Sequence, residues 1–103
     1  MPASRHDELP VALIERMAQI LKILAHPHRL RLIDILQRRR EAPVHELTEA
    51  VGLPQAAVSH HLSLLRRVGL VRCSRRGKES WYAVDDDRPL FILECIRRHG
   101  GKR

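Results

Sequence analysis

The sequence predicts a mainly α-helical fold with one β-hairpin, in the order α-α-α-α-β-β-α, and three observations carry this prediction. Apolar residues recur at helical spacing in the part of the chain before Gly69. Gly52 and Gly69 each stand where such a segment ends, as residues that leave a helix in the left-handed conformation. From Leu70 onward the pattern changes to that of β-strands.

The first two predicted helices each begin at a proline, a residue that a first helical turn tolerates because its missing N–H is not needed there. Pro10 starts a segment that is rich in apolar residues as far as Leu24, with a stripe wider than one core face requires. After a break at residues 25–26, a second helix is expected from Pro27 to about Arg39, where leucine and isoleucine alternate with arginine.

Two further helices are joined by a short glycine-containing turn. The first is expected from about Val44 to Val51, and Gly52 ends it. The second runs from Pro54 to about Val68. Two helices in this arrangement predict a helix-turn-helix.

The rest of the chain predicts a hairpin and a last helix. Strands are expected at residues 70–73 and 80–84, on either side of a basic tip at residues 74–78. This hairpin would be the wing of a winged helix-turn-helix. The last helix is expected from about Pro89 to His99 and is apolar almost all round. One core cannot cover all of its faces, so a partner surface is needed.

The length of the chain limits its class. At 103 residues it can bury one modest hydrophobic core, so we expect one domain at residues 10–99, a flexible N-terminus at 1–9 and a tail at 100–103. No apolar run approaches the ~20 residues that span a bilayer, and residues 1–8 lack the apolar core of a signal peptide. We expect a cytoplasmic protein with no membrane partner.

The charge points to a polyanionic partner. Lys and Arg outnumber Asp and Glu by 19 to 12, and the formal net charge is +7. One Trp, one Tyr and one Phe offer little stacking surface for single strands, so double-stranded DNA is the expected partner. The sequence contains no Gly-rich phosphate loop, nucleophile elbow or paired catalytic carboxylates, and we expect no enzymatic activity.

The helix expected at residues 54–68 sorts its side chains into two faces. At ~100° per residue, Val58, Leu62 and Leu65 fall in one narrow arc and should be buried. The opposite face is polar and basic, and it would fit a major groove roughly 12 Å wide. The candidate DNA contacts on this face are Gln55, Ala56, Ser59, His60, Ser63, Arg66 and Arg67. An ordinary solvated helix face is the alternative.

The predicted wing adds a second group of candidate contacts. Arg75, Arg76 and Lys78 stand at the hairpin tip, where they would meet the minor groove or flanking phosphates. Charges that keep a hairpin edge soluble are the alternative. Helix-turn-helix, basic wing and high positive charge together favour DNA binding.

Five segments together carry a family resemblance: Leu24–Leu32, Leu47–Leu53, Gln55–Arg66, Gly69–Val71 and Arg75–Tyr82. They resemble the arsenic-repressor (ArsR) family of winged helix-turn-helix regulators, and VSHHL at residues 58–62 is the most specific part of the match. The resemblance covers roughly residues 10 to 99. It implies a homodimer formed through the first and last helices, which binds an operator and represses it until a metal ion or redox signal loosens the complex.

The sequence departs from the metal-sensing pattern of that family. Many members carry Cys-Val-Cys where this chain has Pro43-Val44-His45, so no thiolate is present there for a soft metal, and we expect no metal cofactor. Cys95 and His99 lie four residues apart on one helical face and could supply two metal ligands, completed by His or Asp residues of the other subunit. The simpler interpretation is that Cys95 is a small apolar residue of the dimer interface and His99 a charge partner of the helix end.

Several roles stay open. Cys73 and Cys95 are the only cysteines and could form a thiol switch. His61 is expected in the core. His26 and His28 flank Pro27 at a helix start, where a capping or surface role is expected and a metal role for the pair is the alternative. A winged helix that contacts protein or RNA is the alternative function, as is a DNA-binding protein that responds to no small molecule.

Overall fold

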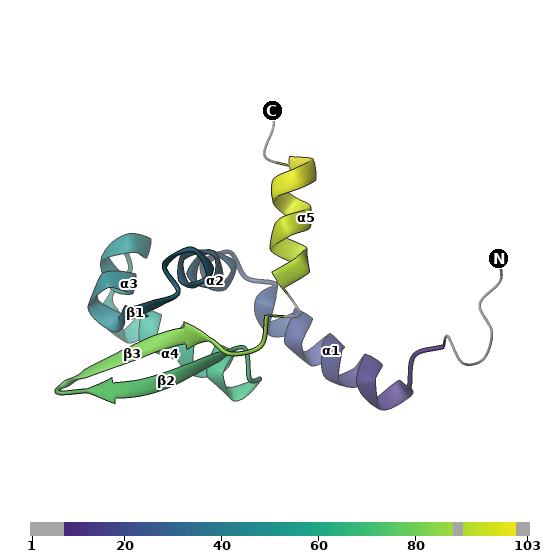
Figure 1. The fold of residues 1–103 in the computed structure, drawn as a ribbon, viewed down its shortest axis with the longest axis horizontal. Coiled ribbons are helices and arrows are strands. Elements are labelled where there is room, and N and C mark those ends of the chain that lie inside the picture. Colours follow the sequence, from purple (N-terminus) through teal and green to yellow (C-terminus); the bar gives the residue numbers. More distant parts are fainter. Residues whose placement is uncertain (1–7, 88–89, 101–103) are drawn as a thin grey trace.

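The computed structural model describes residues 8–87 and 90–100, and within these ranges the chain forms five helices and three strands (Figure 1). In chain order these are α1 (Val11–Leu24), α2 (Pro27–Arg39), β1 (Glu41–Pro43), α3 (Val44–Val51), α4 (Gln55–Arg67), β2 (Val71–Arg76), β3 (Glu79–Val84) and α5 (Phe91–Gly100). The four helices expected before the hairpin are all present, at or within one residue of the expected bounds.

The strand β1 is an addition to the predicted order. Residues 41–43 carry no strand pattern in the sequence, but they pair antiparallel with β3 in the register Glu41 to Ala83 and Pro43 to Trp81, which gives the sheet order β1-β3-β2. Arg40, with a φ of 74°, turns the chain from α2 into this strand. Three residues carry no alternation of their own, so the pairing with β3 creates the strand.

The hairpin is longer and its tip tighter than predicted. β2 continues through Arg76 and pairs in full register with β3, from Val71 opposite Val84 to Arg76 opposite Glu79. Gly77 has a φ of 64° and makes the turn with the residue that follows it. Two of the three predicted tip cations therefore belong to a strand.

The predicted ends of the domain lie partly outside the described residues. Residues 1–7 and 101–103 are outside them, and so is the expected start of the last helix at Pro89. The described part of that helix is α5, which runs from Phe91 through Gly100. Gly100 therefore belongs to the helix, although the sequence predicts that the tail begins there. Arg97 of α5 forms an ion pair with Asp34 of α2.

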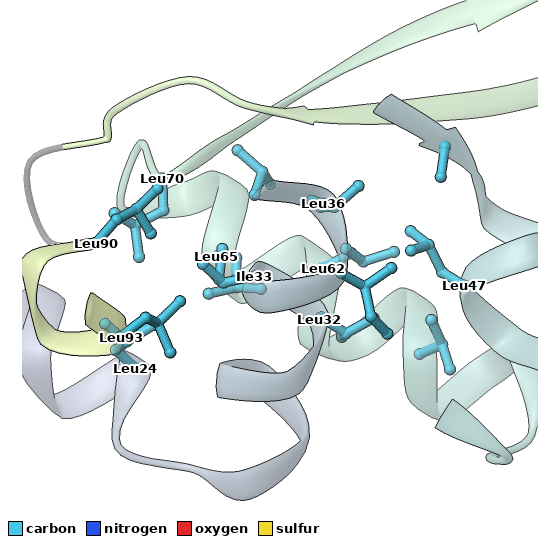
Figure 2. Close-up of a cluster of buried hydrophobic side chains, with 14 of the residues drawn as sticks. Leu24, Leu32, Ile33, Leu36, Leu47, Leu62, Leu65, Leu70, Leu90 and Leu93 are labelled. Carbon is cyan, nitrogen blue, oxygen red and sulfur yellow. The ribbon is translucent and has the colours of Figure 1, made fainter. Parts of the chain in front are cut away.

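One hydrophobic core joins the helices and the base of the hairpin (Figure 2). Leu32, Ile33 and Leu36 of α2 are fully buried at its centre. Figure 2 shows Leu90 and Leu93 at one end of this cluster and Leu47 of α3 at the other. The core therefore fixes α4 and the start of β2 against the same central helix.

The outer faces of α1 and α5 carry apolar side chains that this core does not cover. Figure 1 shows that both helices project from the molecule at the end that lies opposite the hairpin tip. Val11 is 69% exposed and Phe91 is 79% exposed. The other large exposed apolar residues are Leu9, Leu13, Ile14, Leu21 and Ile96. The expected surplus of apolar surface is confirmed, and it lies on the first and last helices and, at Leu9, just before the first helix.

The lengths and compositions of the helices bear on membrane insertion. In the part of the chain that the structure describes, none of them combines the length and the apolar run that a bilayer span requires.

Candidate nucleic-acid interface

The turn between α3 and α4 is built by local sequence. α3 ends at Gly52, which has a φ of 70° and donates its N–H to the Thr48 carbonyl at 2.9 Å. Pro54 precedes α4 in an extended conformation and cannot continue a helix from α3. At the far end, Gly69 has a φ of 84°, and the N–H of Leu70 bonds the Leu65 carbonyl at 3.0 Å. These bonds set the direction in which the chain enters β2.

The two faces of α4 are sorted as the helical period predicts. Val58, Leu62 and Leu65 are fully buried, which confirms the predicted inner face. Ser59, predicted on the outer face, is half-buried. The remaining candidate contacts on this helix are all exposed: Gln55, Ala56, His60, Ser63, Arg66 and Arg67. The outer face thus presents amide, hydroxyl, imidazole and guanidinium groups to solvent from a rigidly packed helix.

The three predicted wing cations divide into two groups. Arg75 and Lys78 are exposed near the turn. Arg76 instead forms an ion pair with Glu41 of β1, and its guanidinium lies 4.4 Å from the centroid of the Trp81 ring. Arg76 is therefore engaged within the sheet, and the wing offers Arg75 and Lys78 to a polyanion.

A second polar pair connects the wing to the helix-turn-helix. His45 of α3 donates from Nδ1 to the Glu79 carboxylate at the start of β3. This hydrogen bond raises the pKa of His45, against a smaller opposing effect of desolvation. At the positions that match the Cys-Val-Cys element of the resembled family, Val44 is buried and the His45 Nδ1 is engaged by Glu79.

The start of α2 meets the middle of α4 through polar side chains. His61 is 9% exposed and accepts a hydrogen bond at Nδ1 from Arg29 Nε at 3.1 Å, which confirms its predicted place in the core. Arg29 Nη1 also donates to the Ile23 carbonyl at 3.0 Å. The His26 side chain caps α2 by accepting from the N–H of His28 at 3.2 Å, which confirms a capping role. Sequence reasoning missed Arg29, because its partner lies 32 residues away.

The two cysteines lie in different parts of the molecule. Cys73 is half-buried in β2 opposite Tyr82, and Cys95 is exposed on α5. Burial, followed by a hydrogen bond with Cys73, raises the pKa of Tyr82. Both cysteines are free thiols, so they form no disulfide with each other within the chain.

The other predicted ligand pair, Cys95 and His99, lies exposed on α5. Among the described residues, no group of three or more His, Cys, Asp or Glu side chains is arranged to hold a metal ion. A site completed by a second subunit stays a prediction.

The fold and the exposed face of α4 define a winged helix-turn-helix DNA-binding domain. The family model for bacterial regulatory proteins of the arsR family matches residues 26–72. The HTH-type transcriptional repressor SmtB of Mycobacterium tuberculosis is 32% identical, over 98% of this chain and 79% of SmtB. The chain belongs to the arsR family and is a transcriptional regulator.

Solved structures agree with this assignment. The crystal structure of NolR from Sinorhizobium fredii superposes with a TM-score of 0.78 at 32% identity, over 100% of this chain and 99% of NolR. A homodimeric winged helix-turn-helix DNA-binding domain from Mycobacterium bovis superposes with a TM-score of 0.75 at 26% identity, over 100% of this chain and 94% of that domain.

Proposed function

We propose that this protein binds a near-palindromic operator as a homodimer and represses transcription from it. The observation that carries the proposal is the division of α4 into a fully buried face and an exposed polar and basic face. A helix held in this way can enter a major groove without losing its packing. Gln55 would pair with adenine, and Arg66 and Arg67 would contact guanine or phosphate. Arg75 and Lys78 would hold the flanking backbone.

The dimer is proposed from the uncovered apolar faces of α1 and α5. These faces include Val11 and Phe91, which are mostly exposed in a single chain. Exposed apolar surface of this kind is expected to be covered by a partner, and the related domain from Mycobacterium bovis is homodimeric. A two-fold dimer would present its two α4 helices about 34 Å apart, which is one turn of DNA.

Repression is supported by the name of a relative, the transcriptional repressor SmtB. A repressor acts by occupying DNA, so tight and selective binding is the property that the function needs. The cytoplasm is the proposed place of action, because the DNA that a bacterial regulator of the arsR family would bind lies there.

A thiol signal is the regulatory hypothesis that the sequence offers. Cys95 is exposed on α5, next to the surface proposed for the dimer, so oxidation there would act on the dimer before it acted on α4. Cys73 is half-buried in the wing and less accessible to an oxidant.

Fluorescence anisotropy tests the proposal with DNA from the promoter of the protein's own gene, a scrambled duplex and an RNA duplex. Titrations from about 50 to about 200 mM salt should show strong weakening of binding to both DNA duplexes, with the promoter DNA bound more tightly at every salt concentration. Equal binding to promoter and scrambled DNA, or preference for RNA, would contradict operator recognition. A parallel series with oxidised protein tests the thiol signal.

A further inference from the structure

Four histidine rings gather where α2 meets α4, and direct DNA contact does not account for them. The ring centroids of His26 and His61 are 4.7 Å apart, and those of His28 and His61 are 5.8 Å apart. His60, on the outer face of α4, has its ring centroid 5.9 Å from that of His61. Arg29 contacts the same group through its bond to His61. We call His26, His28, His60 and His61 the histidine cluster.

Two hydrogen bonds of the cluster depend on an imidazole lone pair. The His26 Nδ1 accepts the backbone N–H of His28, and the His61 Nδ1 accepts the Nε–H of Arg29. Both donors are N–H groups, so each accepting nitrogen must be unprotonated. An imidazolium has no free lone pair on either nitrogen. A proton taken up at Nδ1 therefore removes the cap of α2 or the bond between α2 and α4.

Arg29 makes the second of these bonds important for the position of α4. Its Nη1 donates to the Ile23 carbonyl near the end of α1, while its Nε donates to His61 in α4. One side chain of α2 thus connects three helices. Arg29 is a positioning residue for α4, and His61 is the acceptor through which it acts.

The charges around the cluster oppose a proton. The groups that face His61 are the Ile23 carbonyl of α1 through Arg29, His26 at the N-cap of α2, His28 and Arg29 of α2, and His60 of α4. Burial lowers the pKa of His61, and His26, Arg29, His28 and His60 lower it further. Burial, Arg29 and His28 lower the pKa of His26 in the same way. Both rings are therefore neutral at neutral pH, and the bonds that they accept are intact there.

We propose that the histidine cluster is a proton-binding site that controls the placement of α4. Protonation of the His61 Nδ1 breaks its bond with Arg29, sets two cations against each other and loosens α4 from α2. The inference rests on the proposed function, because α4 is the helix that would read the operator. Acid should therefore reduce selectivity for the operator. Without this coupling, the protonation of surface histidines would only strengthen binding to the DNA backbone.

The test uses variants that keep each hydrogen bond but cannot take up a proton. In His61→Gln an amide oxygen can still accept from Arg29, and in His26→Asn the side chain can still cap α2. His99→Gln, exposed on α5, is the matched control. The ratio of Kd for scrambled DNA to Kd for promoter DNA is measured in a pH series from about 7.5 to about 4.5. The series extends well below the ordinary histidine pKa because burial and neighbouring charges lower the pKa of His61 and His26.

The wild-type ratio should fall by about fivefold or more on acidification, the usual lower range for coupling between two sites. His99→Gln should behave as the wild type, and His61→Gln should keep its ratio. His26→Asn should lose part of the pH dependence and serves as the second variant if His61→Gln does not fold. A wild-type ratio that is unchanged or rises in acid, or a fall that persists in His61→Gln, would overturn the proposal.

A measurement without DNA separates this proposal from the proposed function. In NMR spectra of the free protein, the Arg29 Nε–H and the α4 amides should shift as pH is lowered, and the shift of the Arg29 Nε–H should be absent in His61→Gln. If promoter and scrambled DNA bind equally throughout the pH series, operator recognition fails. The NMR titration then still decides whether the cluster moves α4, and unchanged α4 signals would refute it.

Discussion

Leu62 is fully buried on the inner face of α4, and its replacement by alanine tests the orientation of that helix. The change removes three carbon atoms from a core that also contains Leu32 of α2 and Leu47 of α3 (Figure 2). At about 0.8 kcal/mol for each methylene, the lost burial alone costs about 2.4 kcal/mol. The cavity that remains adds to this, so Leu62→Ala should lower the free energy of unfolding by about 3 to 4 kcal/mol.

Urea denaturation followed by circular dichroism measures this loss. Wild type and variant are compared at one protomer concentration, because the stability of a dimer depends on concentration. Ser63→Ala is the matched control: it is the next residue of the same helix, lies on the exposed face and should leave the free energy of unfolding nearly unchanged. A loss below about 1 kcal/mol for Leu62→Ala, or an equal loss for Ser63→Ala, would refute the assigned faces of α4.

Three further predictions address the interface, the dimer and the wing. Arg67→Ala and Lys78→Ala should each weaken DNA binding and lower its salt dependence by about one counterion, with unchanged unfolding curves; unchanged affinity in both would show that the binding face is misplaced. Phe91→Glu should give monomers in sedimentation equilibrium, because the dimer would bury an unpaired carboxylate; a stable dimer would exclude α5 from the interface. The pKa of His45 is raised in the folded state, so its pair with Glu79 contributes its full stabilisation of the fold at a pH below the ordinary pKa of 6.5. This contribution to the free energy of unfolding is lost as the pH rises through the raised pKa. Accordingly, His45→Gln should lower the melting temperature in acid and have less effect at alkaline pH; an equal effect at both would contradict the pairing.

The helices were predictable because each has its own local signal. Prolines mark the starts of α2 and α4, and Gly52 and Gly69 follow the ends of α3 and α4. The spacing of Val58, Leu62 and Leu65 was enough to orient α4. In contrast, β1 has three residues and exists only through its pairing with β3, which no local pattern reveals.

The candidate site was predictable as a face but not in its contacts. The exposed positions of α4 follow from helical geometry alone. The engagement of Arg76 with Glu41 depends on β1, which places the two side chains together from positions 35 residues apart in the sequence. The bond from Arg29 to His61 likewise spans 32 residues. Such pairs arise from tertiary packing, so a sequence indicates charged residues without showing which of them are already engaged.

Protection of promoter DNA from dimethyl sulfate tests the central claim most directly, because this reagent methylates guanine N7 in the major groove. The proposed dimer should protect guanines in two successive major grooves about 34 Å apart on one side of the duplex. Arg67→Ala should bind more weakly and leave the same two positions protected at saturation. Protection confined to one groove, or none at concentrations where the folded protein is bound, would contradict a dimer that reads DNA through its two α4 helices.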